Sequence, residues 1–344
     1  MKVAMYYANN DVRLEEAPMP KAGPGEAVMR VEASGICGSD VMQWYRAGKT
    51  PLVLGHEVSG QIVEVGEGVT KFAPGDRVVA AHHVPCNTCH YCLRGHDTVC
   101  DTLRATKFYP GGFAQFLRLP AINVDRGLFR MPEEMSYEQG TFVEPLACVY
   151  RGQRIAGVKR ADAVLVIGSG ISGVLHIALA RALGASFIAA TDISGYRLQE
   201  AMKAGANIAI DATMDVPGAF RAANNARGAD IVILTAGAPA AINQAFDTVD
   251  RGGTILFFAP AAEGAKIELP ANKLFWRNEI TLTSSYAANH ADHVTAMQMI
   301  ASDEVNVDGF ITHTLPLSRT QEGFMLVASG GESLKVIVKP HLDA

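Results

Sequence analysis

The sequence has no long apolar run and no marked excess of charge of either sign. Of its 344 residues, 30 are Lys or Arg and 35 are Asp or Glu, so the formal net charge is −5. This balance argues against nucleic acid or an anionic membrane surface as the main partner. The most apolar stretch, residues 161–180, contains an aspartate, a histidine and three glycines, so it is not a membrane span.

We expect neither a secretion signal nor a disulfide framework. The first residues, MKVAMYYANNDVRLEE, lack the apolar core and the small-residue cleavage site of a signal peptide. We therefore expect a soluble, cytoplasmic protein. Its six cysteines are then better explained as metal ligands or buried thiols than as disulfides.

The length of the chain suggests two or three domains, and its composition is that of a folded protein. Hydrophobic residues make up 49% of the chain and charged residues 19%, which is enough apolar material for packed cores. The first third contains short β-rich runs bounded by turn residues, which is typical of an all-β barrel. These runs cover residues 3–7, 27–33, 58–65 and 76–81.

From about residue 162 apolar strand patterns alternate with helical patterns. Strands that are apolar on both faces and separated by helices indicate a parallel sheet covered on both sides. Six such strands suit a doubly wound dinucleotide-binding fold. They are expected at residues 163–167, 187–191, 207–210, 230–234, 254–258 and 280–284, with helices at 171–183, 195–204 and 240–249. We expect a linking helix within residues 136–154.

One glycine-rich turn carries the strongest cofactor signal. The segment VLVIGSGISG combines a strand, a Gly-x-Gly-x-x-Gly turn and a helix start. Gly168 permits the tight turn, Gly170 lets the backbone approach a pyrophosphate, and Gly173 allows the helix to pack closely on the strand. The first helical residues, Ile171 and Ser172, lie at the positive end of the helix dipole. We predict a dinucleotide site here.

The choice between NAD and NADP depends on the end of the next strand. Asp192 lies there, 22 residues beyond Gly170. A carboxylate at this position accepts hydrogen bonds from the adenosine ribose and repels a 2′-phosphate, so NAD is favoured over NADP. Arg197 complicates the choice, although it lies five residues further on in an expected helix. The simpler interpretation of Asp192 is a helix cap.

Four cysteines within one short stretch indicate a structural metal. Cys86, Cys89, Cys92 and Cys100 can converge on one tetrahedral cation, and zinc with four thiolates is a closed coordination. Disulfides between cysteines so close in sequence are hard to form with the required geometry. We predict a zinc-ordered lobe over about residues 85–101. The neighbouring histidines are interpreted as loop residues: His82, His83, His90 and His96.

A second metal site is indicated by a thiol, an imidazole and carboxylates in separate segments. A catalytic zinc needs about three protein ligands and one open position. Cys37 and His56 are the best pair, while Glu57 and Glu144 compete for the third place and one of them exchanges with water. Each of these residues also has a simpler explanation. Cys37 can be read as a buried thiol and His56 as a turn histidine. Glu144 can be read as an extended residue before Pro145 at a helix N-terminus.

Taken together, these motifs resemble those of the zinc-dependent medium-chain dehydrogenases, in particular the sorbitol and threonine dehydrogenase branch. The resemblance rests on GICGSD around Cys37, GHE around His56, the four-cysteine lobe, the EPL sequence at Glu144 and the glycine turn. It covers essentially the whole chain. It implies an α/β fold with a discontinuous GroES-like β-barrel catalytic domain (residues 1–147 and 286–344), a Rossmann domain (residues 148–285), and an active site in the cleft.

The resemblance also implies two zinc ions per subunit, NAD as the hydride acceptor, and a homotetramer or homodimer. The catalytic ligands would be Cys37 and His56 with Glu57 or Glu144. Glu144 stands where simple alcohol dehydrogenases carry a cysteine, which favours polyols. Many relatives have a proton-relay histidine where this chain has Met42. Ser39, the cofactor ribose and water would then carry the proton.

We therefore expect NAD-dependent oxidation of a secondary alcohol in a polyol or sugar alcohol to the ketone. Oxidation of L-threonine or of a phosphorylated polyol is an alternative on the same fold. A phosphate would involve Arg46, Lys49 and Lys107, although solvated loop charges are the simpler interpretation. An alternative of another class is a non-catalytic NAD(H)-binding sensor, which the joint presence of the metal-site residues disfavours.

Overall fold

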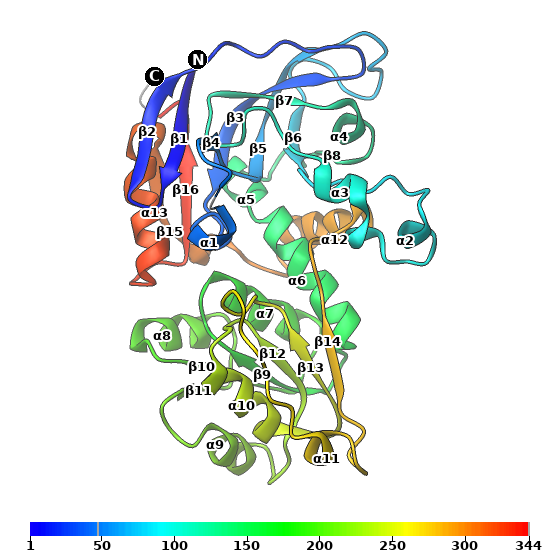
Figure 1. Ribbon diagram of the computed structural model, residues 1–344, viewed down its shortest axis with the longest axis vertical. Coiled ribbons are helices and arrows are strands. Elements are labelled where there is room, and N and C mark those ends of the chain that lie inside the picture. Colours follow the sequence, from blue (N-terminus) through cyan, green and yellow to red (C-terminus); the bar gives the residue numbers. More distant parts are fainter. Residues whose placement is uncertain (47, 343–344) are drawn as a thin grey trace. The chain divides into compact units, whose positions relative to one another are not determined.

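The computed structural model describes residues 1–46 and 48–342, and the chain divides into two compact units (Figure 1). Unit 1 comprises residues 1–147 and 287–344, and unit 2 comprises residues 148–286. Tyr286, which the sequence-based boundary placed with the C-terminal segment, lies in unit 2. The first boundary falls within helix α6 (Val143–Ala156).

Unit 2 is a parallel six-stranded sheet with helices on both faces. Its strand order, β11-β10-β9-β12-β13-β14, is that of a doubly wound dinucleotide-binding sheet, so this prediction is confirmed. The strands are β9 (Ala163–Ile167), β10 (Phe187–Asp192), β11 (Ile208–Asp211), β12 (Ala229–Leu234), β13 (Val249–Phe257) and β14 (Thr281–Ser284).

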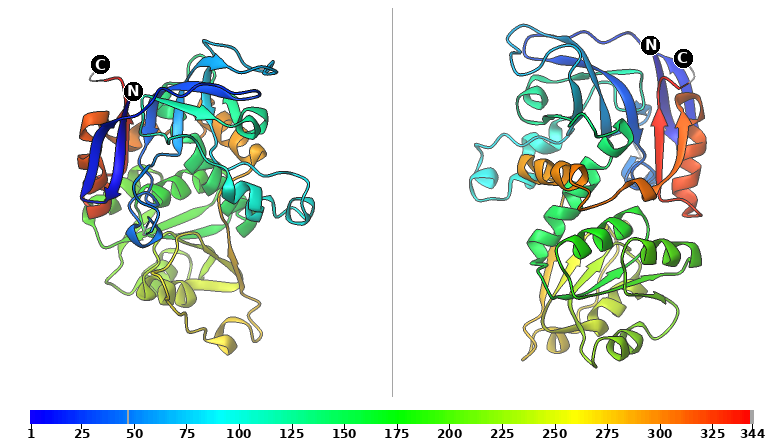
Figure 2. Two further views of the ribbon diagram at one scale, coloured as in Figure 1. Left: turned by 45° about the horizontal axis from the view of Figure 1, so that its top comes forward. Right: turned by 180° about the vertical axis from the view of Figure 1, so that it is seen from behind.

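Two pairs of helices cover the faces of this sheet (Figures 1 and 2). One pair is α7 (Ile171–Ala182) and α8 (Gly195–Lys203), and the other is α9 (Val216–Ala223) and α10 (Pro239–Thr248), with α11 (Ala271–Leu274) before the last strand. Because every residue of β9 is buried, alternate side chains enter two separate cores. Leu165 packs with Phe220 of α9, whereas Val164 packs with Ile177 of α7.

Unit 1 is built mainly from antiparallel strands. Its larger sheet has the order β15-β16-β3-β5-β6-β8, with β7 also paired to β3, and its smaller sheet has the order β2-β1-β4. The strands are β1 (Lys2–Ala8), β2 (Asp11–Glu16), β3 (Ala27–Gly35), β4 (Leu52–Val53), β5 (Glu57–Val65), β6 (Arg77–Ala80), β7 (Phe116–Leu119), β8 (Leu128–Arg130), β15 (Ile311–Pro316) and β16 (Lys335–Lys339).

The C-terminal segment completes the larger sheet. Strand β16 pairs with the end of β3, where Ile337 lies opposite Gly35 and Val338 opposite Ser34. Residues about 300 positions apart in sequence therefore share one core, in which Phe324 packs against Tyr6 and Phe113. This pairing places the last strand beside β3, whose end precedes the candidate metal ligand Cys37.

Short helices occupy the connections of unit 1. They are α1 (Gln43–Arg46), α2 (His90–Leu93), α3 (Asp101–Ala105), α4 (Ala121–Arg126), α5 (Tyr137–Gly140), α12 (His290–Ala301) and α13 (Thr320–Ser329), with 3-10 turns at Asp97–Val99, Asp308–Phe310 and Leu317–Arg319. Capping boxes at Ser136 and Asn289 begin α5 and α12. Across the described part of the chain, no helix has the length and apolar composition needed to cross a bilayer.

Candidate catalytic and metal sites

The paired strands β3 and β5 bring three of the predicted ligands together. Gly35 at the end of β3 lies opposite Glu57 at the start of β5. Cys37 follows β3 and His56 directly precedes Glu57. One ligand atom from each of Cys37, His56 and Glu57 lies within 4.8 Å of the other two. A thiolate, an imidazole and a carboxylate with an open position form a donor set that suits a catalytic zinc.

Glu144, the other candidate for the third ligand, does not belong to this group. It lies in the first turn of α6 and is therefore not extended, contrary to the expectation from Pro145. The first-turn N–H groups of a helix have no acceptor within the helix, so a proline costs no hydrogen bond there. The structure thus favours Glu57 over Glu144 as the neighbour of Cys37 and His56.

A buried aspartate orients the imidazole. Asp40 is fully buried, its Oδ1 lies 3.4 Å from His56 Nδ1, and its Oδ2 accepts a 3.1 Å hydrogen bond from the Cys37 backbone N–H. Burial alone would raise the pKa of Asp40, but His56, Arg46 and the Cys37 N–H together lower it. With Nδ1 directed at a carboxylate, Nε2 is the nitrogen left for a metal. The sequence motif contained Asp40 but did not indicate this role.

The electrostatic environment also acts on His56 itself. Burial opposes its protonation, but the neighbouring Asp40 and Cys37 raise the pKa of His56 well above 6.5. A metal ion binding at Nε2 must displace a proton from this ring, so metal affinity falls as the pH falls.

A lysine that the sequence did not single out holds Glu57. Lys335 on β16 is completely buried, and its Nζ donates a hydrogen bond to Glu57 Oε2. The same ammonium group lies 5.3 Å from the ring centroid of Phe142. One carboxylate oxygen of Glu57 therefore has a protein partner, and the other is left for a metal.

Arg46 was expected to be a solvated loop charge, and that expectation is wrong. Its side chain is only 13% exposed, and Nη2 donates to the Ser39 carbonyl at 3.0 Å and to Asp40 Oδ1 at 3.3 Å. Lys49 and Lys107 are exposed, as expected. A buried carboxylate is costly unless cations compensate its charge, and Arg46 is buried because it pairs with Asp40 together with His56.

Ser39 and Met42 lie on the turn between Cys37 and α1. The Ser39 backbone N–H donates to Cys37 Sγ at 3.4 Å. The Ser39 hydroxyl is half-exposed and has no hydrogen-bond partner within residues 1–46 and 48–342. It is thus available to a ligand. Met42 is half-buried and offers no group that carries a proton.

An imidazole stack that was interpreted as loop residues adjoins His56. The His82 ring lies 4.8 Å from the His56 ring and 3.7 Å from the His83 ring, measured between centroids. Burial, reinforced by the positive charges around it, lowers the pKa of His82 well below 6.5, and burial lowers that of His83 to about 4. Burial therefore favours the neutral form of both rings.

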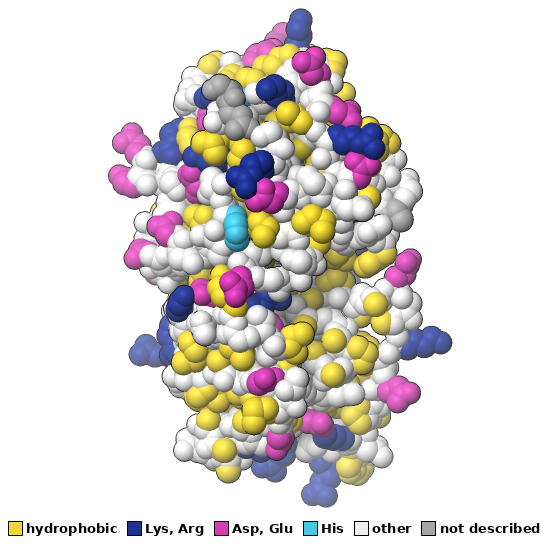
Figure 3. Space-filling model, turned by 90° about the vertical axis from the view of Figure 1, so that its left-hand side faces the viewer, with side chains coloured by type: hydrophobic (Ala, Val, Ile, Leu, Met, Phe, Trp, Pro, Cys, Tyr) yellow, Lys and Arg dark blue, Asp and Glu magenta, His cyan; other side chains and the backbone are white. Residues whose placement is uncertain are grey.

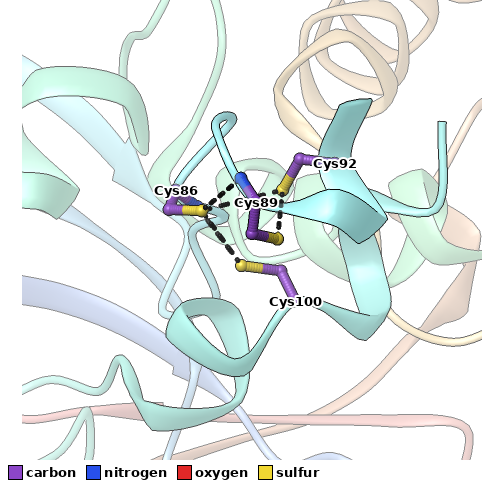
Figure 4. A group of neighbouring side chains, drawn as sticks. All are labelled: Cys86, Cys89, Cys92 and Cys100. Carbon is purple, nitrogen blue, oxygen red and sulfur yellow. Dashed lines mark hydrogen bonds between the residues drawn. The ribbon is translucent and has the colours of Figure 1, made fainter. Parts of the chain in front are cut away.

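The four-cysteine lobe has the geometry of a closed metal site. The four thiols point toward a common centre (Figure 4), with Sγ–Sγ distances of 3.5 Å for Cys89–Cys92, 3.6 Å for Cys86–Cys100 and 4.0 Å for Cys86–Cys92. A tetrahedral zinc with Zn–S bonds of about 2.3 Å needs sulfurs about 3.8 Å apart. Disulfide sulfurs lie at about 2 Å, so the spacing fits a metal.

Hydrogen bonds and burial give the thiols of this lobe different pKa values. The hydroxyl and backbone N–H of Thr88 lower the pKa of Cys86 to about 5, whereas burial raises the pKa of Cys92 to about 12. Four thiolates this close repel one another, and a divalent cation removes that repulsion. Asn289 at the start of α12 donates to Asp97 Oδ2 at 2.8 Å, which anchors the lobe to the rest of unit 1.

The glycine turn of unit 2 has the features of a pyrophosphate cradle. Gly168 has a φ of +96°, which disfavours any side chain, and a Cβ on Gly173 would overlap the Gly168 carbonyl oxygen. Gly170 is the N-cap of α7, so Ile171 and Ser172 form its first turn. The backbone here lies close to a helix N-terminus, where anions bind.

Asp192 is anchored beside this turn. Its Oδ2 accepts a 2.8 Å hydrogen bond from the Ser169 N–H, and its Oδ1 accepts a 2.9 Å bond from the Ser194 N–H. The cap of α8 is Ser194, so Asp192 is not merely a helix cap. The guanidinium of Arg197 lies 3.8 Å from the position of a Cβ on Gly170, and its Nε is buried without a partner among the described residues.

Comparison with known proteins identifies the family. Residues 23–132 match the model of the alcohol dehydrogenase GroES-like domain, and residues 173–302 match that of the zinc-binding dehydrogenases. The chain is 31% identical over 340 residues to the sorbitol dehydrogenase of Gallus gallus, which covers 96% of this chain and 93% of the relative. The chain belongs to the zinc-dependent medium-chain dehydrogenases. It lies in the sorbitol dehydrogenase-like branch of this family.

Solved structures agree with this assignment. A zinc-binding dehydrogenase from Sinorhizobium meliloti 1021, bound to NADP, has a TM-score of 0.89 at 26% identity and covers 98% of this chain and 99% of its own. The 2R,3R-butanediol dehydrogenase of Bacillus subtilis has a TM-score of 0.86 at 27% identity, with 99% of both chains covered. The GroES-like and Rossmann folds are thereby confirmed. This dehydrogenase is an oxidoreductase that uses zinc and a nicotinamide cofactor.

Proposed function

We propose that this dehydrogenase oxidises a secondary hydroxyl of a polyol or sugar alcohol to the ketone, with NAD as the hydride acceptor. The observation that carries the proposal is the convergence of Cys37, His56 and Glu57 within 4.8 Å. The substrate class is supported by similarity to a sorbitol dehydrogenase and to a butanediol dehydrogenase. Residues 1–147 and 287–344 would form the catalytic domain, and residues 148–286 would bind the cofactor.

Each residue of the site has a distinct part in this reaction. The chemistry that zinc supplies when bound is a lowered pKa of a hydroxyl at the open position. Cys37, His56 and Glu57 would hold the ion, and Asp40 keeps His56 oriented. The hydroxyl of Ser39 is our candidate for the first proton acceptor, with water and the cofactor ribose beyond it. A bound nicotinamide would supply the hydride acceptor, so that the products of the oxidation would be a ketone, NADH and a proton.

The charges around the site suit an ion of charge +2. Three side chains are anionic when a metal is bound, namely the Cys37 thiolate, Asp40 and Glu57. Two cations, Arg46 and Lys335, offset them in part. The remaining negative charge of these residues would offset about half of the charge of a bound zinc, which would make the ion a milder Lewis acid and ease release of the ketone.

A second zinc ion would be held by Cys86, Cys89, Cys92 and Cys100, which form a closed, structural set. The proposal of NAD, rather than NADP, rests on Asp192, because its fixed carboxylate would repel a 2′-phosphate. Free cysteines arranged as thiolate ligands suit a reducing compartment such as the cytoplasm.

We propose two kinds of partner, a small uncharged substrate and a second copy of the chain, and features of the surface support both. On the face shown in Figure 3, acidic and basic side chains are interspersed, an arrangement that does not suit a polyanion such as nucleic acid. Strand β14 is an edge of the sheet of unit 2, and exposed apolar residues precede it, including Leu269, Phe275 and Trp276. We therefore propose a homo-oligomer, a dimer or tetramer, that covers this edge. Dissociation by Trp276→Lys in light scattering would support it.

Turnover of a substrate panel tests the function. NADH formation by the zinc-loaded protein would be followed with free polyols, inositols, phosphorylated polyols, L-threonine and simple alcohols. The highest kcat/KM is expected for a free polyol. A higher value for L-threonine or a phosphorylated polyol would move the substrate to that class. No turnover with any compound, with NAD still bound and zinc present, would contradict the proposal in favour of an NAD(H) sensor.

A further inference from the structure

His82 occupies a fixed position beside the metal group. Its backbone carbonyl accepts a 3.2 Å hydrogen bond from Asn123 Nδ2, which also donates to the Ala81 carbonyl at 2.9 Å. Asn123 is completely buried, so this part of the backbone is anchored. The ring of His82 lies between the rings of His56 and His83, with the Phe108 ring 6.1 Å away. Packing on two sides limits the rotation of the His82 ring.

Among the residues that the structure describes, the His82 ring makes no hydrogen bond, whereas His83, His293 and His290 each place one ring nitrogen at a backbone carbonyl. His83 Nδ1 lies 2.9 Å from the Leu103 carbonyl, His293 Nδ1 lies 2.7 Å from the Asn289 carbonyl, and His290 Nδ1 lies 2.8 Å from the Arg126 carbonyl. Within the described ranges, neither ring nitrogen of His82 has a hydrogen-bond partner, and Nδ1 is buried. A buried polar atom without a partner destabilises the protein unless a ligand or water pairs with it.

The ring is also not a metal ligand in this arrangement. The cluster of ligand atoms within 4.8 Å comprises Cys37, His56 and Glu57, and His82 is not part of it. His82 is nevertheless in ring contact with His56. His82 therefore borders the metal group on the side of the His56 ring.

We propose that His82 determines substrate specificity by hydrogen bonding to the hydroxyl adjacent to the one that is oxidised, so that the site selects vicinal diols over simple alcohols. A neutral imidazole has one N–H donor and one acceptor. A hydroxyl can pair with either, whereas a methylene group leaves the imidazole unpaired. The inference rests on the proposed function, since it names the feature of the polyol that the same site recognises.

The test compares two alcohols that differ by one hydroxyl, 2,3-butanediol as a mixture of isomers and 2-butanol. The kcat/KM with NAD would be measured for the zinc-loaded wild type and for His82→Phe, which keeps a flat ring without hydrogen-bonding atoms. His82→Gln restores polar atoms. His290→Phe is the matched control, because its ring packs against Phe129 at an interplanar angle of 40° and lies outside the His56–His82–His83 group. Zinc content is measured for every variant.

The expected result is a fall of about 10-fold or more in the ratio of diol to 2-butanol kcat/KM in His82→Phe. His82→Gln recovers part of the ratio, and His290→Phe leaves it unchanged. The loss lies mainly in KM, because the adjacent hydroxyl is bound in the ground state as well as in the transition state. An unchanged ratio in His82→Phe, with zinc retained, would overturn the inference while leaving the proposed function intact.

A binding measurement without turnover separates the two claims. Calorimetry of each alcohol against the zinc-loaded protein with NADH gives the ratio of Kd values directly. If the wild type turned over no alcohol, the proposed function would fail, and the Kd ratio in His82→Phe would still test the role of His82. A Kd ratio equal in the wild type and His82→Phe would refute that role.

Discussion

Lys335 and Glu57 form a buried ion pair that joins the C-terminal strand β16 to the first residue of β5. The two residues are 278 positions apart, and their side chains are 0% and 2% exposed. Two charges removed from water are stable only when each compensates the other. The pair therefore fixes the carboxylate of Glu57 beside Cys37 and His56, and it makes the candidate metal site depend on the last strand of the chain.

Replacing Lys335 by Met should destabilise the protein strongly. The substitution leaves the Glu57 carboxylate buried and uncompensated, so we expect a loss of about 3–5 kcal/mol in the free energy of unfolding. Urea denaturation of the metal-free and zinc-loaded protein measures it. The loss should be smaller with zinc, because the ion supplies the missing positive charge.

Lys339→Met on the same strand is the control for this experiment. Lys339 pairs with Glu138, but the two side chains are 32% and 25% exposed. Water screens such a pair, so its loss should cost less than about 1 kcal/mol. Equal costs for the two substitutions would show that the buried pair has no special role.

Replacing Cys100 by Ser should remove one zinc ion and loosen the lobe around residues 86–100. Cys100 is 1% exposed and its Sγ lies 3.6 Å from that of Cys86. The set then has three thiolates and binds zinc more weakly. We expect one bound zinc instead of two by elemental analysis, and faster proteolysis within the lobe. Retention of two zinc ions would contradict the assignment of the cysteines.

Replacing Asp192 by Ser should shift the cofactor preference toward NADP. The carboxylate repels a 2′-phosphate, whereas Arg197 nearby would attract it. We expect the ratio of kcat/KM for NADP to that for NAD to rise by about 10- to 100-fold, since like charges in contact cost several kcal/mol. Adding Arg197→Leu should reverse much of that gain. An unchanged ratio in Asp192→Ser would show that Asp192 does not discriminate between NAD and NADP.

Acid should destabilise the protein through His176. This residue is completely buried in α7, with Nδ1 3.2 Å from Gln153 Nε2, and burial lowers its pKa to about 3. The unfolded chain takes up a proton near pH 6.5, while the folded protein does not until near pH 3. The unfolded state thus binds more protons as the pH falls, and stability is lost below pH 6.5.

The size of this effect follows from the separation of the two pKa values. Between pH 7 and pH 4.5 the loss should be about 2.5 kcal/mol. Chemical denaturation across this range would show a flatter dependence in His176→Leu, because leucine takes up no proton in either state. Parallel curves for the two proteins would contradict a buried, neutral His176.

The regular elements of unit 2 were largely predictable from the sequence. The apolar run at residues 163–167 corresponds to β9 without any shift, because a strand buried on both faces must be apolar throughout. Helix α9 was not predicted. It has only eight residues and a proline in its first turn, so its sequence is too short to show a clear helical repeat of apolar residues. The helix is stabilised by packing of Phe220 in the core.

The two groups of candidate metal ligands could be proposed from the sequence because their spacing is local. Cys37 and His56 stand in short motifs, and the four cysteines lie within 15 residues. Their supporting groups could not be found in this way. Lys335 becomes a partner of Glu57 only through the pairing of β16 with β3, and His82 meets His56 only because β6 pairs with β5. Long-range strand pairing has no local signature in one sequence.

In the proposed function, zinc held by Cys37 and His56 supports alcohol oxidation. The most direct test is NADH formation with the best polyol substrate before metal removal, after chelation, and after addition of stoichiometric zinc, in the wild type, Cys37→Ala and His56→Ala. We expect activity to vanish on chelation and to return with zinc in the wild type only, while both variants fold, bind NAD and contain one zinc ion fewer. Wild-type turnover in either variant would contradict the account.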